Sequence, residues 1–258
     1  MVGLVDQLDD VDRPEDLHVW ERESGDSAKD SSTLRVSVII PTFNEAETVG
    51  DAILSAGAAP GVEVIVVDGG SDDGTAESAR SAGAKVIVSA CERAAQMNVG
   101  AMAATGETLV FLHADTRLPE DYHESVLRAL ARPGSVAGAF ELGIDAPRIA
   151  LRIVERLANW RSRRLRMPYG DQALFMAAES FREMGGFPEI PIMEDFEFVR
   201  RMRRRGRVEI VPAAVKTSAR HWLALGVLRT TLVNQAVVLA YFLGISPSRI
   251  ARWYNRSR

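Results

Sequence analysis

Residues 36–112 alternate between segments typical of buried strands and segments typical of helices. The predicted strands are short runs rich in β-branched residues, and they span 36–40, 62–67, 86–88 and 108–112. The predicted helices between them span 45–57, 75–82 and 92–104. Strands connected through helices pair in parallel with right-handed crossovers. This order therefore predicts an α/β fold with a Rossmann-like, mostly parallel sheet and helices on both faces.

Polar residues follow three of these predicted strands directly. Thr42 and Glu45 follow the first strand, the segment 68–73 follows the second, and His113 and Asp115 follow the fourth. In open α/β sheets, ligands bind beyond the carboxyl ends of the strands. We therefore expect a ligand site at this edge. The first turn reads Pro-Thr-Phe-Asn-Glu without a glycine, which disfavours hydride transfer with a nicotinamide dinucleotide.

After residue 119 the alternation becomes irregular. Helices are predicted at 121–131, 147–166 and 193–205, and strands at 135–143 and 172–178. No charged residue occurs between Arg229 and Arg249. This stretch is long enough to span a bilayer, but its Thr, Asn, Gln and Ser residues argue against a span. We expect helices that pack on the core, form a homodimer contact or lie at a membrane surface.

The first 34 residues differ in composition from the rest of the chain. They hold ten of the 35 acidic and three of the 31 basic residues, which leaves 25 acidic and 28 basic residues for 35–258. We expect 1–34 to be a disordered acidic leader, since it has little apolar content to offset its ordering entropy. It lacks the apolar region of a signal peptide. A globular domain at 35–220 and a helical extension at 221–258 follow.

Five segments in this order resemble glycosyltransferase family 2. They are 36–45, 66–75, 111–119, 185–188 and 193–206. More narrowly, Tyr169–Gln172 together with 191–195 resembles a compact bacterial subgroup described beside radical-SAM and selenium-related proteins. The resemblance covers about 35–255 and implies a GT-A fold. It also implies a nucleotide-binding half at 35–118, a sugar and acceptor half at 119–220, and a nucleotide-diphosphate sugar, first a UDP-sugar, as donor.

The resemblance implies a metal-assisted nucleotide site. The family's Asp-x-Asp element reads His113-Ala114-Asp115 here, so we expect Asp115 to bind Mg²⁺ or Mn²⁺ and His221 to be a further ligand. Relatives often have two consecutive acids after the second strand, whereas this chain has Asp68 and Gly69. The expected nucleotide-binding residues are Pro41, Thr42, Phe43, Glu45, Asp68, Gly69, Arg93, His113, Ala114 and Asp115.

Inverting transfer needs a base that takes the proton of the attacking hydroxyl. The resemblance assigns this role to Asp195, with Glu194 beside it at the start of a helix. Residues expected to contact the donor sugar or the acceptor are Tyr169, Gly170, Asp171, Gln172, Gly186 and Glu194. The like charges of Glu194 and Asp195 would raise each other's pKa. The helix N-terminus would lower both pKa values, because it favours negative charge.

Several alternatives stay open at this point. A retaining GT-A enzyme would use Asp195 only to position the acceptor, and an inactive nucleotide-sugar-binding scaffold would not use it at all. A nucleotidyltransferase is disfavoured, because no Gly-rich phosphate loop follows the first strand. The arginine runs at 152–166 and 200–207 are solvated helix faces, or they recognise an anionic acceptor or membrane. Nucleic acid is not expected, because aromatic residues are not interleaved with them.

The acceptor class is a small molecule or a lipid-linked molecule. We expect the protein in the cytoplasm, with peripheral contact at the inner face of the membrane as a further option. Its one cysteine, Cys91, excludes an internal disulfide and agrees with a reducing compartment.

Overall fold

The structure is a computed structural model that describes residues 36–57 and 61–257. The predicted acidic leader lies outside the described residues. The described residues belong to one compact unit. Its first half contains, in order, β1 (Val36–Thr42), α2 (Val49–Ala56), β2 (Val62–Asp68), α3 (Thr75–Ser81), β3 (Lys85–Val88), α4 (Arg93–Met102) and β4 (Thr108–Phe111). Each predicted strand and helix of this half is present.

The second half is less regular, as expected. It contains β5 (Thr116–Arg117), α5 (Tyr122–Leu130), β6 (Ser135–Asp145), α6 (Ile149–Leu165), the single turn η2 (Gly170–Gln172), β7 (Leu174–Ala177), α7 (Ala178–Glu183), α8 (Glu194–Arg205), β8 (Arg207–Ser218), α9 (Arg220–Leu225), α10 (Val227–Phe242) and α11 (Pro247–Ser257). The prediction missed β5, α7 and β8. Strand β8 pairs with β6, and its register shifts at Pro212 and Ala213, while Glu209 and Lys216 interrupt its apolar pattern elsewhere.

All described strands form one sheet in the order β3-β2-β1-β4-β7-β6-β8-β5. β1 pairs in parallel with β2 and β4, and β2 pairs in parallel with β3. β4 and β6 both pair antiparallel with β7, and β5 pairs antiparallel with β8. The sheet is therefore parallel in the first half and mixed beyond it, because the chain reverses direction at β7.

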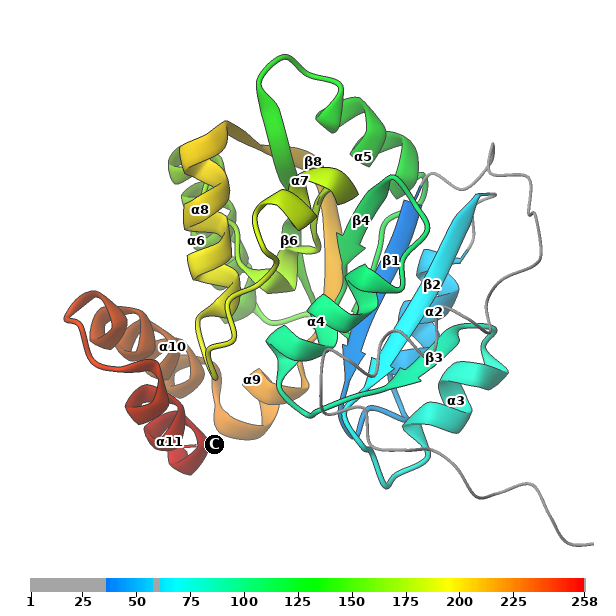
Figure 1. Cartoon of the computed structure of the whole chain (residues 1–258). Helices are drawn as coiled ribbons and strands as arrows, with labels where there is room; N and C mark the ends of the chain where they lie inside the picture. Colours follow the sequence, from blue (N-terminus) through cyan, green and yellow to red (C-terminus); the bar gives the residue numbers. More distant parts are fainter. Residues whose placement is uncertain (1–35, 58–60, 258) are drawn as a thin grey trace, which may run out of the picture. The chain divides into compact units, whose positions relative to one another are not determined.

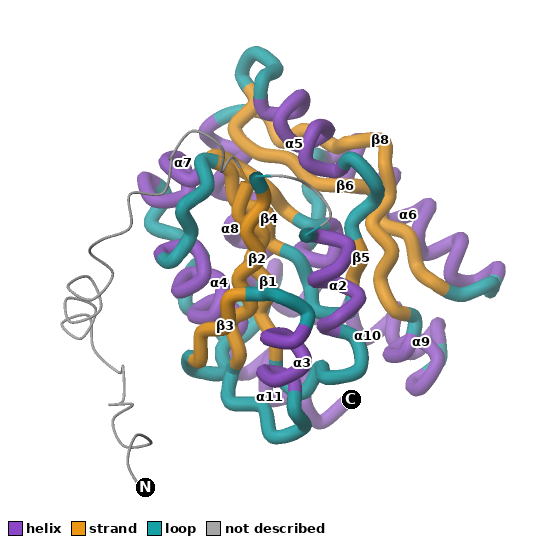
Figure 2. Tube along the Cα trace, turned by 90° about the vertical axis from the view of Figure 1, so that its right-hand side faces the viewer, coloured by secondary structure: helices purple, strands orange, loops and turns teal. Residues whose placement is uncertain are grey.

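Helices cover both faces of the sheet, as predicted, and Figure 2 shows the two layers on either side of the strands. One apolar core joins α4, α7 and α8 to one face. The other core joins α2, α3 and α5 to the opposite face. β1 is buried along its whole length, which explains its continuous apolar sequence. Its carboxyl end therefore lies at a fixed position between two packed layers.

The C-terminal helices α10 and α11 follow α9 (Figure 1). Val237 of α10 and Ile250 of α11 are buried in the same core as α4 and α8. In the described part of the chain, no helix is long and apolar enough to cross a membrane. The expected C-terminal helices are thus present, and they pack on the core.

Candidate active site

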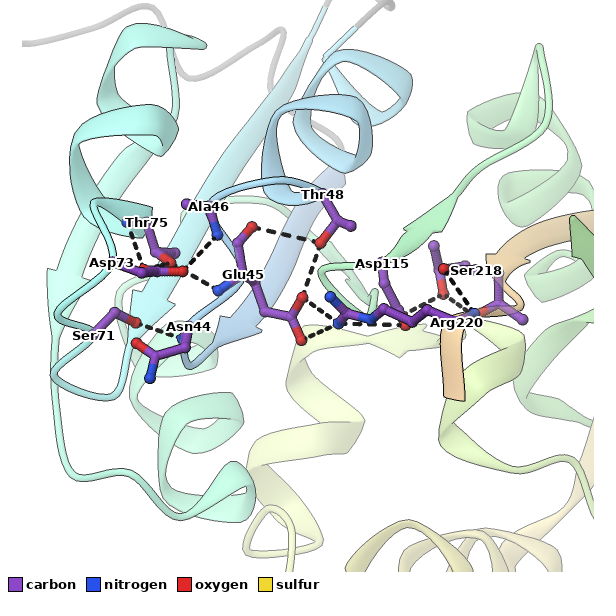
Figure 3. Close-up of polar contacts among 12 residues, drawn as sticks. Asn44, Glu45, Ala46, Thr48, Ser71, Asp73, Thr75, Asp115, Ser218 and Arg220 are labelled. Atoms are coloured by element: carbon purple, nitrogen blue, oxygen red, sulfur yellow. Dashed lines mark hydrogen bonds and ion pairs between the residues drawn. The ribbon is translucent and has the colours of Figure 1, made fainter. Parts of the chain in front are cut away.

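The loops after β1 and β2 are tied together by hydrogen bonds. The backbone amide of Glu45 donates to Oγ1 of Thr75 at 2.8 Å, and the amide of Ala46 donates to Oδ2 of Asp73 at 3.1 Å. Figure 3 shows these contacts at the carboxyl ends of the two strands. The polar residues that the sequence placed after separate strands therefore come together at one edge of the sheet, as expected.

Asp68 has a structural role in this conformation. It is only 2% exposed. Its Oδ1 accepts hydrogen bonds from the hydroxyls of Thr42 (3.1 Å) and Ser71 (2.5 Å), and its Oδ2 accepts from the amides of Gly70 (3.1 Å) and Ser71 (2.9 Å). Both oxygens are thus used within the protein. The expected contact of Asp68 with a nucleotide base is not available here, because the turn after β2 takes up the carboxylate.

Gly69 stands where no side chain fits. A Cβ at this position would lie 2.8 Å from Nε2 of Gln96 and 3.0 Å from Cα of Cys91. Gln96 cannot yield easily, since its Nε2 donates to the carbonyl oxygens of Thr42 (2.7 Å) and Val67 (3.1 Å). Related proteins often have a second acid at this position, whereas the surrounding atoms here leave room only for a glycine. No pattern in the sequence indicates this role of Gln96 on α4.

Arg220, which the sequence did not single out, connects two expected site residues. Its Nη2 donates to both carboxylate oxygens of Glu45 and lies 3.7 Å from Oδ2 of Asp115 (Figure 3). Burial raises the pKa of Asp115, while the positive charge of Arg220 lowers it and the Glu45 carboxylate raises it again. Nε of Arg220 is buried and has no hydrogen-bond partner within the described residues. The guanidinium of Arg220 thus places a positive charge beside Asp115, the predicted metal ligand.

A pocket of about 290 Å³, open to solvent, lies beyond β1 and β4. Its lining residues include Pro41, Arg93, His113, Gly170, Phe187, Glu194 and Asp195. A Cβ built on Gly170 would lie 3.1 Å from both Nε2 of His113 and Oδ2 of Asp195. Burial and the nearby Arg93 lower the pKa of His113 to about 3, so its imidazole is neutral at neutral pH. His113 and Asp195, 82 positions apart in sequence, thus face the same small space.

Asp195 is held at the start of α8. Its Oδ2 accepts a hydrogen bond of 2.6 Å from the amide of Gly170, and its Oδ1 accepts one of 2.7 Å from the amide of Phe196. Met193, directly before α8, has a positive φ of 69°, a strained conformation for a residue other than glycine. The strained turn and the two amide donors fix the direction of the carboxylate.

Glu194 lies beside Asp195 but is more enclosed. Oε1 of Glu194 is 3.8 Å from Nη1 of Arg93. Burial raises the pKa of Glu194, the Asp195 carboxylate raises it further, and Arg93 acts in the opposite direction. The sequence left open how like charge and helix position balance, and for Glu194 the net effect raises the pKa, with burial as the largest cause.

Gln172, expected to contact a sugar, is instead fully buried. Its Oε1 accepts from Ser162 Oγ (2.7 Å) and from the Tyr169 amide (3.2 Å), and its Nε2 donates to the Phe140 carbonyl (2.8 Å). The amide therefore makes its hydrogen bonds within the protein. Gln172 holds the loop 169–172 against α6 and β6.

Tyr169 and Asp171 flank the same loop. The guanidinium carbon of Arg161 lies 3.4 Å from the centre of the Tyr169 ring, a cation–π contact. Burial raises the pKa of Asp171 to about 6, opposed by Arg161 and reinforced by the charges of Asp195 and Asp115. Oδ1 of Asp171 is buried without a hydrogen-bond partner within the described residues. The charges of Asp115 and Asp195 therefore both act on Asp171.

The other predicted site residues lie around this centre. Phe43 is 49% exposed, and Ala114 is buried. Gly186 has a φ of 69°, and a Cβ there would lie 2.6 Å from Oδ1 of Asn98. Asn98 bonds both backbone groups of Phe187, accepting from its amide at 2.8 Å and donating to its carbonyl at 3.0 Å. Gly186 thus shapes the turn that places Phe187 in the pocket.

His221 lies on α9, next to Arg220 in sequence. It lines a second pocket together with Arg229, Asn234 and Tyr254. The pKa of Asp115 is lowered by positive charge on His221, after the larger effect of Arg220. His221 is therefore near Asp115 but is not among the residues that line the pocket of His113 and Asp195.

Among the described residues, no group of three or more His, Cys, Asp or Glu side chains is arranged to hold a metal ion. Mg²⁺ in nucleotide sites is commonly bound by one or two carboxylates, with phosphate oxygens and waters completing the shell. Asp115 fits this pattern as a single carboxylate, with Arg220 3.7 Å from its Oδ2 and the charge of His221 also acting on it. The donor set thus fits a cation that arrives with a diphosphate, not a preformed protein cage.

The comparisons with known proteins agree with this fold. The chain is 49% identical over 53 residues to glycosyltransferase AglJ of Haloferax volcanii; the match covers 20% of this chain and 18% of that protein. The mannosyltransferase PcManGT of Pyrobaculum calidifontis, solved with GDP-Man and Mn²⁺, superposes with a TM-score of 0.61 at 22% identity, covering 93% of this chain and 75% of that one.

Glucosyl-3-phosphoglycerate synthase of Mycobacterium tuberculosis, solved with Mn²⁺, UDP and glucosyl-3-phosphoglycerate, superposes with a TM-score of 0.54 at 18% identity, covering 71% of each chain. At these identities the superpositions establish the GT-A fold. The sequence profile described as "Glycosyl transferase family 2" matches residues 37–182, more than half of the chain, from the second residue of β1 to beyond β7. The chain therefore belongs to glycosyl transferase family 2.

Proposed function

We propose that this protein transfers a sugar from a nucleotide-diphosphate sugar to an acceptor hydroxyl with inversion at the anomeric carbon. The observation that carries the proposal is the pocket in which His113 and Asp195 face each other across Gly170. Family membership supports the reaction class. In this proposal, residues 35–118 bind the nucleotide and 119–220 hold the sugar and acceptor. The narrower bacterial subgroup remains a prediction from Tyr169–Gln172.

Asp195 acts as the base in the proposed reaction. The acceptor oxygen forms a bond to the anomeric carbon while its proton moves to a carboxylate oxygen of Asp195. The bond from that carbon to the diphosphate oxygen breaks, and its electron pair leaves with the nucleoside diphosphate. The amides of Gly170 and Phe196 hold the carboxylate in place. Burial and the Asp195 carboxylate raise the pKa of the neighbouring Glu194.

A divalent cation held by Asp115, with His221 as a further ligand, would neutralise the charge that develops on the diphosphate. Arg220 supports the same task, because its guanidinium lies between Glu45 and Asp115 at the edge where diphosphate is expected. The neutral His113 leaves this edge one negative charge short of the Asp-x-Asp pattern.

The donor is proposed to be a UDP-sugar, with a GDP-sugar as the second choice. Solved relatives of the same fold hold UDP and GDP-Man. Asp171 is proposed to bond sugar hydroxyls, because one of its oxygens is buried without a partner within the described residues. The acceptor is a small molecule or a lipid-linked molecule, and the protein acts in the cytoplasm or at the inner membrane surface.

A ligand screen tests this proposal. The melting temperature is measured with UDP- and GDP-sugars, each with and without Mn²⁺, for the wild type and Asp115→Ala. A matching donor at about 100 times its Kd stabilises the fold by about 2.7 kcal/mol. We expect one donor to raise the melting temperature in the presence of Mn²⁺, with a smaller rise in Asp115→Ala. If no donor of either class raises it or is consumed, the proposed function is wrong.

A further inference from the structure

The outward faces of α6 and α10 each carry an exposed apolar stripe. On α6, the stripe side chains are 53–83% exposed and consist of Ile149, Ile153, Leu157 and Trp160. On α10, they are 59–73% exposed and consist of Leu228, Leu232, Leu239 and Phe242. The spacing of three, four or seven positions places each set on one side of its helix. Large exposed apolar patches mark surfaces that another partner covers.

The charge around these stripes is strongly positive. Exposed arginines on and beside α6 include Arg148, Arg152, Arg156, Arg163 and Arg164. The one acid of α6, Glu155, is buried and pairs with Arg152. Residues 219–257, which include α10 and α11, contain no acidic residue at all. An apolar stripe beside arginines, without acids, matches the chemistry of an anionic phospholipid surface.

We propose that the stripes of α6 and α10 form a docking face for a membrane that contains anionic phospholipids. The two helices contact each other, and Val227 of α10 packs with Leu151 and Val154 on the inner side of α6. No helix of the described chain can span a bilayer, so the helices lie on the surface with their apolar side chains inserted. Figure 1 shows α10 and α11 beside α9, the short helix that follows β8.

A second copy of this chain fits the face less well. In a two-fold dimer the same patch of each subunit meets its counterpart. The arginines of α6 would then approach each other. Arg152 and Arg163 already pair with Glu155 and Glu141 of the same chain, and α6 and residues 219–257 hold no exposed acid to pair with the others. Like charges across an interface oppose association. The charge pattern therefore favours lipid over self-association.

Helix α10 also contacts α8, which carries the proposed base. Phe242 of the α10 stripe makes an edge contact with Phe196, with ring centres 5.4 Å apart, and Phe196 directly follows Asp195. Tyr241 of α10 also donates to Oε2 of Glu197 at 3.2 Å. Docking would thus bring the bilayer next to the proposed base. Here the inference rests on the proposed function: it makes the acceptor a lipid-linked molecule rather than a freely diffusing one.

Vesicle flotation of the full chain without any nucleotide sugar tests the docking face. Vesicles of phosphatidylcholine mixed with phosphatidylglycerol are compared with vesicles of phosphatidylcholine alone. We expect binding to the mixed vesicles, weakened at high salt because surface charge is screened. The variant Arg156→Gln/Arg164→Gln should bind at least tenfold more weakly, since each arginine near such a surface contributes roughly a fivefold factor.

The apolar part is tested by Ile153→Gln/Leu157→Gln on α6 and by Leu228→Gln/Leu232→Gln on α10. Each variant should lose most vesicle binding. Because all four side chains are exposed, melting temperatures should remain close to that of the wild type. Matched controls are Leu54→Gln and Met102→Gln, which change equally exposed apolar residues of α2 and α4, and Arg80→Gln/Arg128→Gln. These controls should bind as the wild type does.

The proposal is overturned if the wild type does not float with anionic vesicles, or if the stripe variants float as well as the controls. It is also overturned if light scattering shows a dimer that the stripe variants convert to monomer, since a second copy would then cover the face. Failure of every UDP- and GDP-sugar to bind in vesicle-free solution with Mn²⁺ would contradict the proposed function and leave docking intact.

Discussion

The backbone amide of Gly170 donates a 2.6 Å hydrogen bond to Oδ2 of Asp195, linking two segments 25 positions apart. The same glycine contacts the imidazole of His113 so closely that a Cβ would lie 3.1 Å from both side chains. Gly170 is therefore the point at which the loop after β4, the loop before β7 and the start of α8 meet. The proposed base depends on this junction for its position.

Gly170→Ala should slow transfer while leaving the fold intact. The added methyl group would crowd His113 and Asp195 at 3.1 Å, so the carboxylate must shift by a few tenths of an ångström. Such misplacement of a catalytic group should lower kcat by roughly tenfold or more. Steady-state kinetics with the matched donor measure this effect. Gly50→Ala on α2, with open space around it, is the control and should keep wild-type kcat.

The first half of the fold could be predicted from sequence because its strands are apolar on both faces. β8 could not, since it combines Arg207, Glu209 and Lys216 with a register shift near Pro212. Contacts between residues far apart in the chain could not be predicted from the sequence either. Arg220 reaches Glu45 across 175 positions, and no local pattern indicates such a pair.

The structure brings some of the predicted site residues together and gives others hydrogen bonds within the protein. Asp195 and His113 do share a pocket. Asp68 and Gln172, however, use their polar atoms within the protein. Residue type alone does not tell a ligand-binding carboxylate or amide from one that holds a turn, because the distinction depends on whether other parts of the chain satisfy it.

Gly69→Ala should destabilise the protein, because its Cβ would lie 2.8 Å from Nε2 of Gln96 and 3.0 Å from backbone of Cys91. Overpacking of this kind costs about 1–3 kcal/mol. Urea unfolding should show this loss, whereas Gly50→Ala should be stabilised by about 0.5–1 kcal/mol, since it adds helix propensity without a clash. A Gly69→Ala variant as stable as the wild type would show that α4 shifts readily to make room.

Asp171→Asn should change the pH dependence of stability. Its folded-state pKa, raised to about 6 from 3.8, means that the folded protein holds this proton more tightly than the unfolded chain does. Stability should therefore fall as pH rises from about 4 to 6, with a cost on the order of 2 kcal/mol above that window. Asp171→Asn should remove this part of the decline and be more stable than the wild type at pH 8.

Urea unfolding at several pH values checks this prediction. Asp72→Asn, which changes an exposed carboxylate in the turn after β2, serves as the control and should follow the wild-type curve. An Asp171→Asn curve parallel to that of the wild type between pH 4 and 6 would contradict the assigned pKa.

Arg220→Met should destabilise the protein at neutral pH. The change leaves the carboxylates of Glu45 and Asp115 without their shared cation. The pKa of Asp115, which Arg220 lowers, should rise further. We expect a loss of about 1 kcal/mol at pH 7 that shrinks at low pH, as the Asp115 carboxylate takes up a proton.

Thermal unfolding at pH 7 and pH 3 measures this difference. Arg117→Met is the matched control, because Arg117 pairs with two exposed acids, Asp51 and Asp145, at the surface. Its effect should be smaller, as exposed ion pairs contribute little. An equal loss in Arg220→Met at both pH values would show that packing, not charge, explains it.

The most direct measurement is NMR of the sugar product formed by the wild type and by Asp195→Asn with the matched donor and Mn²⁺. We predict a product whose anomeric configuration is opposite to that of the donor, and a kcat in Asp195→Asn lower by roughly 10²- to 10⁴-fold with donor binding retained. A product of unchanged configuration, or full turnover by Asp195→Asn, would contradict Asp195 as the base of an inverting transfer.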